Sequence, residues 1–375
     1  MKIILFEAIA VMTGTIIGAG ILGIPYVFAQ AGFWTGSLVL AIVALAMLLL
    51  KLMYGEMTLR TRGNHQISGY TEIYLGKLAK HFMSFILIAS IYGALLAYLI
   101  GQGEVIQAIS GAPTFWASIV FYAIFSIFIL IGVSIIKKSE LIMSAFIFFI
   151  VIAIAILTHD HIDLANLKGF SWSQLLIPYG VLLFASSGIV AVPELRLILK
   201  RREKFMKRAI IWGCALPPVI YFLFAALVIS VSGVKVTEIA SVGLGQLLGW
   251  KMILIANIFA FFTMATSFLT LGLALHEIYQ FDYKLSRRMS WLLVVAVPLI
   301  LFLSGARDFV QVIGLVGALG IGIAGFFEVI TFWVARKKGK RKPEYAIPNW
   351  LSLLGGSFVI LLFMFGFIYT FFSLL

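Results

Sequence analysis

A seven-residue pattern that could bind a small charged molecule through its backbone occurs twice in the chain. Residues 19–25 read Ala-Gly-Ile-Leu-Gly-Ile-Pro, and residues 187–193 read Ser-Gly-Ile-Val-Ala-Val-Pro. Because glycine costs about 1 kcal/mol and proline about 3 kcal/mol inside a helix, we expect a helix to break at each copy. A broken helix presents free N–H groups with a positive dipole end on one side and free carbonyls on the other. A carboxylate and an ammonium group could therefore be bound there without charged side chains.

Two adjacent hydroxyls and a residue one turn before them, in the second half of the chain, could bind a small cation. Thr263, Thr266 and Ser267 lie within five consecutive residues. Adjacent hydroxyls together with a backbone carbonyl one turn earlier form the cluster of hard oxygen ligands that a dehydrated cation requires. The alternative is that these hydroxyls bond to carbonyls of their own helix, as Ser and Thr commonly do in membrane helices.

A carboxyl group directly after the second proline could carry a proton. Glu194 follows Pro193 in an apolar stretch, and ionisable groups inside membrane segments are candidates for function. The alternative interpretation is a structural ion pair with Arg196. Four other acids in apolar stretches rank behind Glu194: Glu7, Glu56, Glu277 and Glu328.

The composition places these groups in a membrane. Of the 375 residues, 62% are hydrophobic and 11% are charged, and the mean hydropathy is +1.11. Soluble domains are about half apolar and a quarter charged, so a soluble domain is excluded. At about 20 apolar residues per crossing, the pattern predicts one all-α integral membrane domain over residues 1–375 with 11 transmembrane helices. The predicted spans lie near residues 3–30, 34–59, 82–107, 115–136, 140–158, 174–198, 208–232, 244–280, 289–304, 309–334 and 350–373.

The positive charges predict the orientation of this domain. With these spans, 24 of the 28 Lys and Arg residues fall on one side of the membrane, and we assign Lys51 to this group. The other side has only Lys168, Lys235, Lys251 and Arg307. Cytoplasmic loops are enriched in Lys and Arg, so we expect a multi-pass plasma membrane protein with a cytoplasmic N-terminus and an extracytoplasmic C-terminus. The net charge of +13 then indicates lipid contact and orientation, and no nucleic-acid partner.

The two copies of the glycine–proline pattern also predict internal symmetry. Five spans separate the two copies, so the helices that carry them cross in opposite directions and the halves are inverted repeats. Repeat one would cover residues 1–158 and repeat two residues 174–336, with the helix at 350–373 outside both. Paired interruptions of this kind are typical of transporter binding sites. The alternative is a small-residue face for helix packing.

The first copy lies in a longer segment that resembles a known family. Residues 13–25 read Thr-Gly-Thr-Ile-Ile-Gly-Ala-Gly-Ile-Leu-Gly-Ile-Pro, and residues 31–33 read Ala-Gly-Phe. This segment resembles the first helix of the amino acid/auxin permeases and of bacterial aromatic amino acid permeases, which belong to the amino acid, polyamine and organocation superfamily. The resemblance implies five plus five inverted helices, broken helices 1 and 6, and a cation-coupled amino acid transporter.

The resemblance also implies roles for individual residues. The backbone N–H groups of Ala19 and Gly20 would bind the substrate carboxylate, and Thr15 would lie nearby. Phe184 would shape the pocket for the substrate side chain, unless it is only a packing or lipid-facing aromatic. The substrate ammonium would meet carbonyls of the second break, at Phe184, Ala185 and Ser187.

The resemblance implies two candidates for the coupling ion. In sodium-coupled superfamily members a hydroxyl pair on helix 8 meets two carbonyls of helix 1. These carbonyls correspond here to Gly14 and Ile17, and the pair corresponds to Thr266 and Ser267, with Thr263 one turn earlier. Some proton-coupled members instead place a lysine from span 5 at this position. Residues 141–158 contain no Lys or Arg, which favours sodium. The similarity to proton-driven aromatic permeases favours a proton, carried by Glu194.

Together these patterns predict a secondary active transporter. It would carry a neutral L-amino acid, apolar or aromatic, in symport with a cation by alternating access, with no cofactor except sodium as the coupling ion. Proton coupling or exchange remains the alternative, as does a receptor or channel without coupled transport. The sequence predicts no enzyme and no other metal site, and it leaves the oligomeric state open.

Overall fold

The computed structural model describes residues 2–132, 152–281 and 283–373, and every regular element in these residues is helical. An apolar chain in lipid must satisfy its backbone hydrogen bonds internally, which an α-helix does within one segment. The long uninterrupted helices are α3 (Phe33–Arg60), α5 (Lys77–Ser110), α6 (Thr114–Ile131), α10 (Met206–Ser232), α12 (Trp250–Phe281), α13 (Arg287–Leu303) and α16 (Asn349–Ser373).

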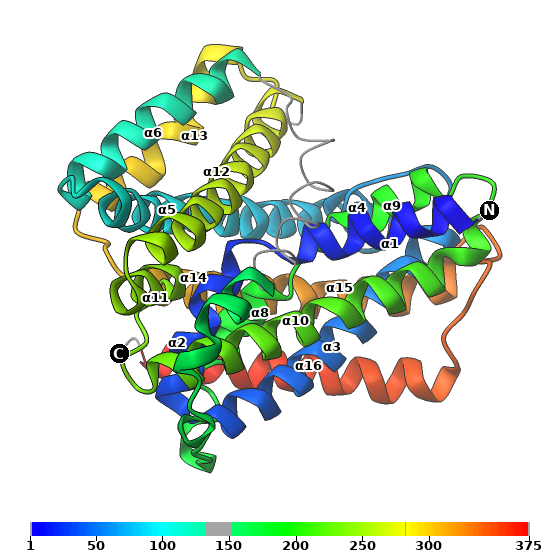
Figure 1. Ribbon diagram of the computed structural model, residues 1–375. Helices are drawn as coiled ribbons and strands as arrows, with labels where there is room; N and C mark the ends of the chain where they lie inside the picture. The colour runs from blue at the N-terminus through cyan, green and yellow to red at the C-terminus, as the bar shows by residue number, and fades with distance from the viewer. Residues whose placement is uncertain (1, 133–151, 282, 374–375) are drawn as a thin grey trace.

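Shorter helices and an irregular turn complete the bundle (Figure 1). The helix α4 (Ile67–Leu75) lies near the end of the bundle that contains the N-terminus, and α11 (Ala240–Leu248) lies near the opposite end. A π-helical turn, η6 (Val316–Ile321), separates α14 (Phe309–Leu315) from α15 (Gly322–Lys338). Turns of 3-10 helix occur at η2 (His159–His161), η3 (Leu164–Asn166), η4 (Trp172–Gln174) and η5 (Glu203–Phe205).

The described residues contain seven helices long and apolar enough to cross a membrane, or eight when the bent pair at residues 4–31 is taken as one span. The sequence predicts eleven. Of the other three predicted spans, 140–158 lies mostly outside the described residues, 174–198 is divided into two short helices, and 289–304 corresponds to the 17-residue α13. An all-helical protein with several long apolar helices is therefore confirmed.

Backbone hydrogen bonds join connecting segments to one another at each end of the bundle. At one end, the Arg341 N–H donates to the Arg60 carbonyl, which joins the segments after α15 and α3. At the other end, Phe33 N–H donates to the Lys168 carbonyl and Asp163 N–H to the Ser230 carbonyl. This grouping agrees with the predicted alternation of basic and non-basic connections. The two termini also lie at opposite ends (Figure 1).

The predicted environment of Lys51 is wrong. The charge pattern groups Lys51 with the basic loops, but it lies in the interior of α3 and is only 1% exposed. Lys51 lies nine positions before Arg60, a distance of about 13 Å along the helix axis. This leaves 23 Lys and Arg residues on the predicted cytoplasmic side, so the charge asymmetry persists without Lys51.

Candidate functional site

The first copy of the glycine–proline pattern interrupts its helix, as predicted. The helix α1 (Lys2–Ile16) ends before Ile17, Gly18 has an extended backbone (φ −120°), and the 3-10 helix η1 (Ala19–Gly23) leads into α2 (Ile24–Ala31). The two parts are bent by 49°. Pro25 is the second residue of α2, where its missing N–H removes no helical hydrogen bond.

The second copy also interrupts its helix. Residues 186–190 separate the helix α8 (Tyr179–Ala185) from the helix α9 (Ala191–Ile198). In this segment Gly188 has φ +67°, a left-handed conformation that glycine adopts without steric cost. Pro193 lies in the first turn of α9, where it terminates no helix.

The two breaks contact each other through glycines that leave no space for a side chain. A Cβ atom on Gly20 would lie 2.7 Å from the Cα atom of Ala185. A Cβ atom on Gly188 would lie 3.2 Å from the Cα atom of Ile16. Real Cβ atoms essentially never show the first distance, and the second is tighter than most real Cβ contacts, so the close approach of the two backbones depends on glycine. The breaks therefore face one another inside the bundle.

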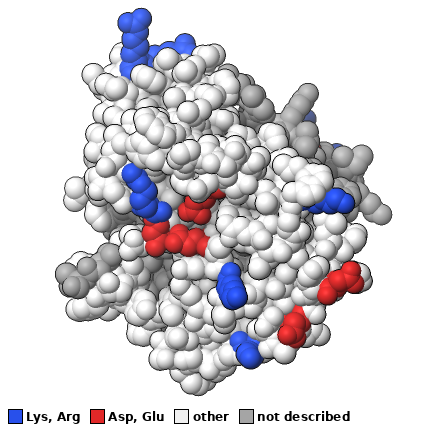
Figure 2. All heavy atoms as spheres, turned by 60° about the vertical axis from the view of Figure 1, so that its left-hand side comes forward, with Lys and Arg blue, Asp and Glu red and all other residues white. Residues whose placement is uncertain are grey.

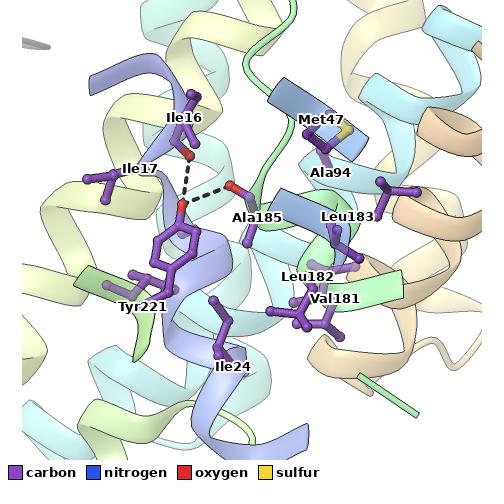
Figure 3. Packing of buried hydrophobic residues seen from close by; sticks show 14 of the residues in the cluster. Ile16, Ile17, Ile24, Met47, Ala94, Val181, Leu182, Leu183, Ala185 and Tyr221 are labelled. Carbon is purple, nitrogen blue, oxygen red and sulfur yellow. Dashed lines mark hydrogen bonds between the residues drawn. The ribbon is translucent and has the colours of Figure 1, made fainter. Parts of the chain in front are cut away.

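A tyrosine that the sequence did not single out joins the two breaks. The buried Tyr221 of α10 has its hydroxyl 3.0 Å from the Ile16 carbonyl and 2.8 Å from the Ala185 carbonyl (Figure 3). These are the last residues of α1 and α8, so the negative dipole ends of two half-helices meet at one donor. No local motif marks Tyr221, because the feature is a contact between three distant segments.

A buried lysine binds the second break. Lys51 Nζ donates to the Ser186 carbonyl at 2.6 Å. Next to this bond is a small cavity of about 10 Å³, lined in part by Ile16, Ser186 and Cys214, with room for about one water molecule. An ammonium group of the protein itself therefore donates a hydrogen bond to one of the carbonyls that the second break leaves without a helical partner.

The predicted substrate ligands lie at the breaks, and several already have partners. The Phe184 carbonyl accepts the Ser187 N–H at 3.2 Å, and the Thr15 hydroxyl donates to the Val11 carbonyl at 2.8 Å in its own helix. Ala185 accepts from Tyr221. Each carbonyl has a second lone pair, so these contacts leave acceptor capacity. The ligand roles of these residues stay predictions.

The predicted cation ligands on α12 do not share one environment. The Ser267 hydroxyl lies 3.7 Å from the position of a Cβ atom on Gly18, next to the first break, and interacts with Tyr98 of α5. Thr263 is buried, and its hydroxyl has no hydrogen-bond partner among the described residues. Thr266 donates to a carbonyl of its own helix at 2.9 Å, as the alternative interpretation predicts.

Glu194 does not have the predicted surroundings. Its side chain is exposed on α9, and the predicted partner Arg196 bonds elsewhere. Arg196 donates to the carbonyls of Thr58 and Thr61, at 2.6 and 3.1 Å, and to the Glu203 carboxylate at 3.3 Å. The prediction that Glu194 pairs with Arg196 is therefore wrong. Arg196 instead joins α9 to the end of α3.

The other four acids differ in burial and in partners. Glu7 and Glu277 are exposed. Glu56 is buried but forms ion pairs with Arg60 at 2.8 Å and Arg336 at 3.0 Å. Glu328 is 0% exposed, and neither of its carboxyl oxygens has a hydrogen-bond partner among the described residues.

Acidic groups lie at the end of the bundle opposite the basic loops. The Glu238 carboxylate accepts the N–H groups of Phe309 and Val310, at 2.9 and 3.3 Å, and so caps α14. Burial and the nearby Asp308 raise the pKa of Glu238. Figure 2 brings this end forward and shows acidic side chains gathered near a surface depression, with basic side chains beside and below them.

These features define an α-helical, multi-pass membrane protein whose centre is lined by the backbone of two interrupted helices. The chain belongs to the tryptophan/tyrosine permease family, which matches residues 1–373. This is a family of amino acid transporters. The sequence resemblance to the amino acid/auxin permeases therefore indicated the right kind of protein but the wrong family.

Two relatives match nearly the whole chain. Glutamine transporter 2 of Aliivibrio fischeri is 23% identical in an alignment of 352 residues that covers 90% of this chain and 91% of that protein. Tyrosine-specific transport system 1 of Haemophilus influenzae is 26% identical in an alignment of 363 residues that covers 88% of each chain. The names of both relatives are those of amino acid transport proteins.

Proposed function

We propose that this protein is a secondary active transporter that moves a neutral L-amino acid, apolar or aromatic, across the plasma membrane in symport with a cation. The main support is the meeting of the two breaks at Tyr221, which brings the released backbone groups of α1 and α8 together inside the bundle. The names of the relatives, with glutamine and tyrosine, support a substrate with an uncharged side chain.

The substrate would bind between the breaks as a zwitterion. Its carboxylate would accept from the N–H groups of Ala19 and Gly20, which begin η1 and so have no partner within that helix. Its ammonium would donate to carbonyls at Phe184, Ala185 and Ser187. Gly20 contacts Ala185 directly in this conformation, so the amino acid binds only after the breaks separate. This requirement supports transport by alternating access.

The full architecture that we propose is eleven spans with a cytoplasmic N-terminus and an extracytoplasmic C-terminus. Repeats at 1–158 and 174–336 would rock around the site, with the helix at 350–373 outside both. The support comes from the geometry of the breaks: α1 and α8 approach the centre from opposite ends, and both end at Tyr221 (Figure 1). Opposite approach is the arrangement that inverted repeats produce.

If the cation is sodium, it would bind between α12 and the first break. Thr263 offers a buried hydroxyl without a partner, and Ser267 lies beside Gly18. The carbonyls of Gly14 and Ile17 would complete the ligand set with Thr266. Proton coupling is the alternative, and the two ions predict different responses to imposed gradients.

Uptake into proteoliposomes tests this proposal. The purified protein should accumulate labelled glutamine, tyrosine or another neutral amino acid when a cation gradient is imposed, and sodium and proton gradients should be applied separately. Accumulation that requires one gradient would support symport. Binding without uptake would contradict transport, and a flux that saturates at no substrate concentration would indicate a channel.

A further inference from the structure

Glu328 and Lys51 are two buried ionisable groups whose charges the proposed function does not use. Glu328 lies in α15 and Lys51 in α3, and the two helices pack together. Each residue lies within electrostatic range of the other, yet no ion pair within 4.0 Å joins these two described side chains. Lys51 instead donates to Ser186 in the second break.

Among the described residues around Glu328, Lys51 is the one cation that acts on it. Tyr54 of α3 interacts with Glu328, Tyr70 of α4 interacts with Tyr54, and Cys214 of α10 interacts with Lys51. The cations at this end of α15 and α3, Arg336 and Arg60, are paired with Glu56. From α16, α5 and η6, which also pack against α15, no described ionisable side chain acts on Glu328.

An orphaned carboxyl group in an apolar interior is stable only when a proton or a cation neutralises it. Two protonation states can therefore exist here. When Glu328 carries a proton, Lys51 has no competing anion and stays on the Ser186 carbonyl. When Glu328 loses the proton, its carboxylate attracts the Lys51 ammonium, and the Ser186 carbonyl must find another donor.

We propose that Glu328 is the proton-binding site of this transporter, and that Lys51 transmits its protonation state to the second helix break. This inference rests on the proposed transport function and deepens it by naming the group that binds the coupling proton and the group that responds to it. In each cycle, the Glu328 carboxylate takes one proton from the outer solution and releases it to the cytoplasm. With a neutral amino acid, one positive charge crosses the membrane per substrate.

Glu328 fits this role better than the other acids of the apolar segments. A coupling group must be shielded from bulk water in part of the cycle, otherwise the proton is lost without transport of substrate. Glu194, Glu7 and Glu277 are exposed. Glu56 is buried, but it is already paired with two arginines and accepts the Ile347 N–H, so it is not an unpartnered group.

The first test uses the unmodified protein in proteoliposomes that contain a pH-sensitive dye. Addition of a transported amino acid outside should acidify the interior, and an acidic outer solution should drive accumulation without sodium. Amino acid uptake with no acidification, or uptake driven only by sodium, would overturn the coupling inference and leave the proposed transport function intact. No uptake or exchange under any gradient would instead contradict the proposed function.

The second test compares Glu328→Gln with Glu277→Gln, a matched change of an exposed carboxyl group. Glu328→Gln should lose proton-driven accumulation and substrate-induced acidification, but it should keep counterflow exchange, which needs no net proton movement. Glu277→Gln should retain both activities. If Glu328→Gln still accumulates substrate in response to the proton gradient, the inference is wrong.

The role of Lys51 is tested by Lys51→Met and by the double variant with Glu328→Gln. Lys51→Met leaves a buried carboxyl without its nearby cation, so proton-driven uptake should be lost or should require a different pH. The double variant is neutral throughout and should behave like Glu328→Gln, with exchange retained. If Lys51→Met has the wild-type pH profile of uptake, Lys51 does not transmit the protonation state. If a variant fails to fold, the dye measurement on the unmodified protein still decides whether a proton is carried.

Discussion

The two helix breaks have related sequences and share the hydroxyl of Tyr221, but different groups hold them. The first break is an extended Gly18 followed by a 3-10 helix, and its polar neighbours on α12 are uncharged hydroxyls. The second break contains Gly188 in a left-handed conformation, and the Ser186 carbonyl accepts from the ammonium of Lys51.

This difference indicates that the backbone geometry of a break and the charge that acts on it are separate properties, since only the second break is bonded to a charged side chain. Hydroxyl and backbone groups do not titrate near neutral pH. The hydrogen-bonding groups of the first break are therefore the same on both sides of the membrane, even when the pH differs. The second break is bonded to a lysine within range of Glu328, so its bonding depends on protons. We therefore expect the first break to serve mainly in substrate binding and the second also in coupling.

Replacement of Gly188 by alanine should have the largest effect, because it strains the second break in two ways. A Cβ atom in the left-handed region costs about 1–2 kcal/mol. The same atom would lie 2.7 Å from Ile16 Cγ1, and such overpacking costs about 1–3 kcal/mol. We expect the free energy of unfolding to fall by about 2–5 kcal/mol in total, measured by denaturant unfolding in detergent, and uptake to be lost.

The control for this change is Gly322→Ala at the start of α15. A Cβ atom there meets no atom closer than 3.8 Å, and φ is −60°, so the added methyl group fits a helical backbone. Gly322→Ala should be as stable as the unmodified protein. Equal stability of both alanine variants would contradict the tight contact between Gly188 and Ile16.

Gly20→Ala should have the next largest effect, and it acts on the first break. Gly20 is in a 3-10 helix with an ordinary backbone, so the cost is only the clash of the new Cβ atom 2.7 Å from Ala185 Cα. We expect a loss of about 1–3 kcal/mol of stability and weaker substrate binding, measured as the KM of uptake. If the KM is unchanged, the substrate does not bind at this contact.

Tyr221→Phe should weaken both breaks, by about 1–3 kcal/mol in total, because two buried carbonyls lose the hydroxyl whose single proton they share. Since neither carbonyl titrates, the loss of uptake should be the same at every pH, unlike the effect of Lys51→Met. The control is Tyr122→Phe, which removes a hydroxyl bonded at 2.6 Å to the Val295 carbonyl, away from the breaks. Tyr122→Phe should reduce stability but not uptake per folded molecule. A pH-dependent defect in Tyr221→Phe would contradict the separation of roles.

The sequence predicted the positions of both breaks because glycine and proline act through the local backbone. The interruptions fall at residues 17–18 and 186–190, inside the predicted copies or directly before them. Local preference also accounts for the long apolar helices. The number of spans and the orientation depend on which segments cross the membrane. Length and hydropathy alone do not decide this for α13 and for the divided α8–α9 segment, because their helices are short.

The sequence did not identify Tyr221, Lys51 or the orphaned state of Glu328, because each depends on which face of a helix points inward. A helix in lipid is apolar on all sides, so its hydrophobic pattern carries little information about rotation. One signal was present for Lys51: it lies about 13 Å inside the end of its helix, too deep for a loop cation. Glu194 was favoured because it follows the proline motif, but its side chain points outward.

Glu238→Gln should have the smallest effect, and it tests whether charge control of the second break extends to the start of α14, the helix that packs against α8. Burial and Asp308 raise the pKa of Glu238, so the folded protein holds this proton more tightly than the unfolded chain. The resulting stability is present below the ordinary pKa of about 4.3 and is lost as the pH rises through the raised value. Glutamine cannot ionise but can still accept from the Phe309 N–H, so the variant should be slightly more stable than the unmodified protein at neutral pH and equal to it in acid.

The measurement is the melting temperature of both proteins across this pH range. Parallel curves would show that Glu238 does not titrate differently on folding, and would limit charge control to Lys51 and Glu328.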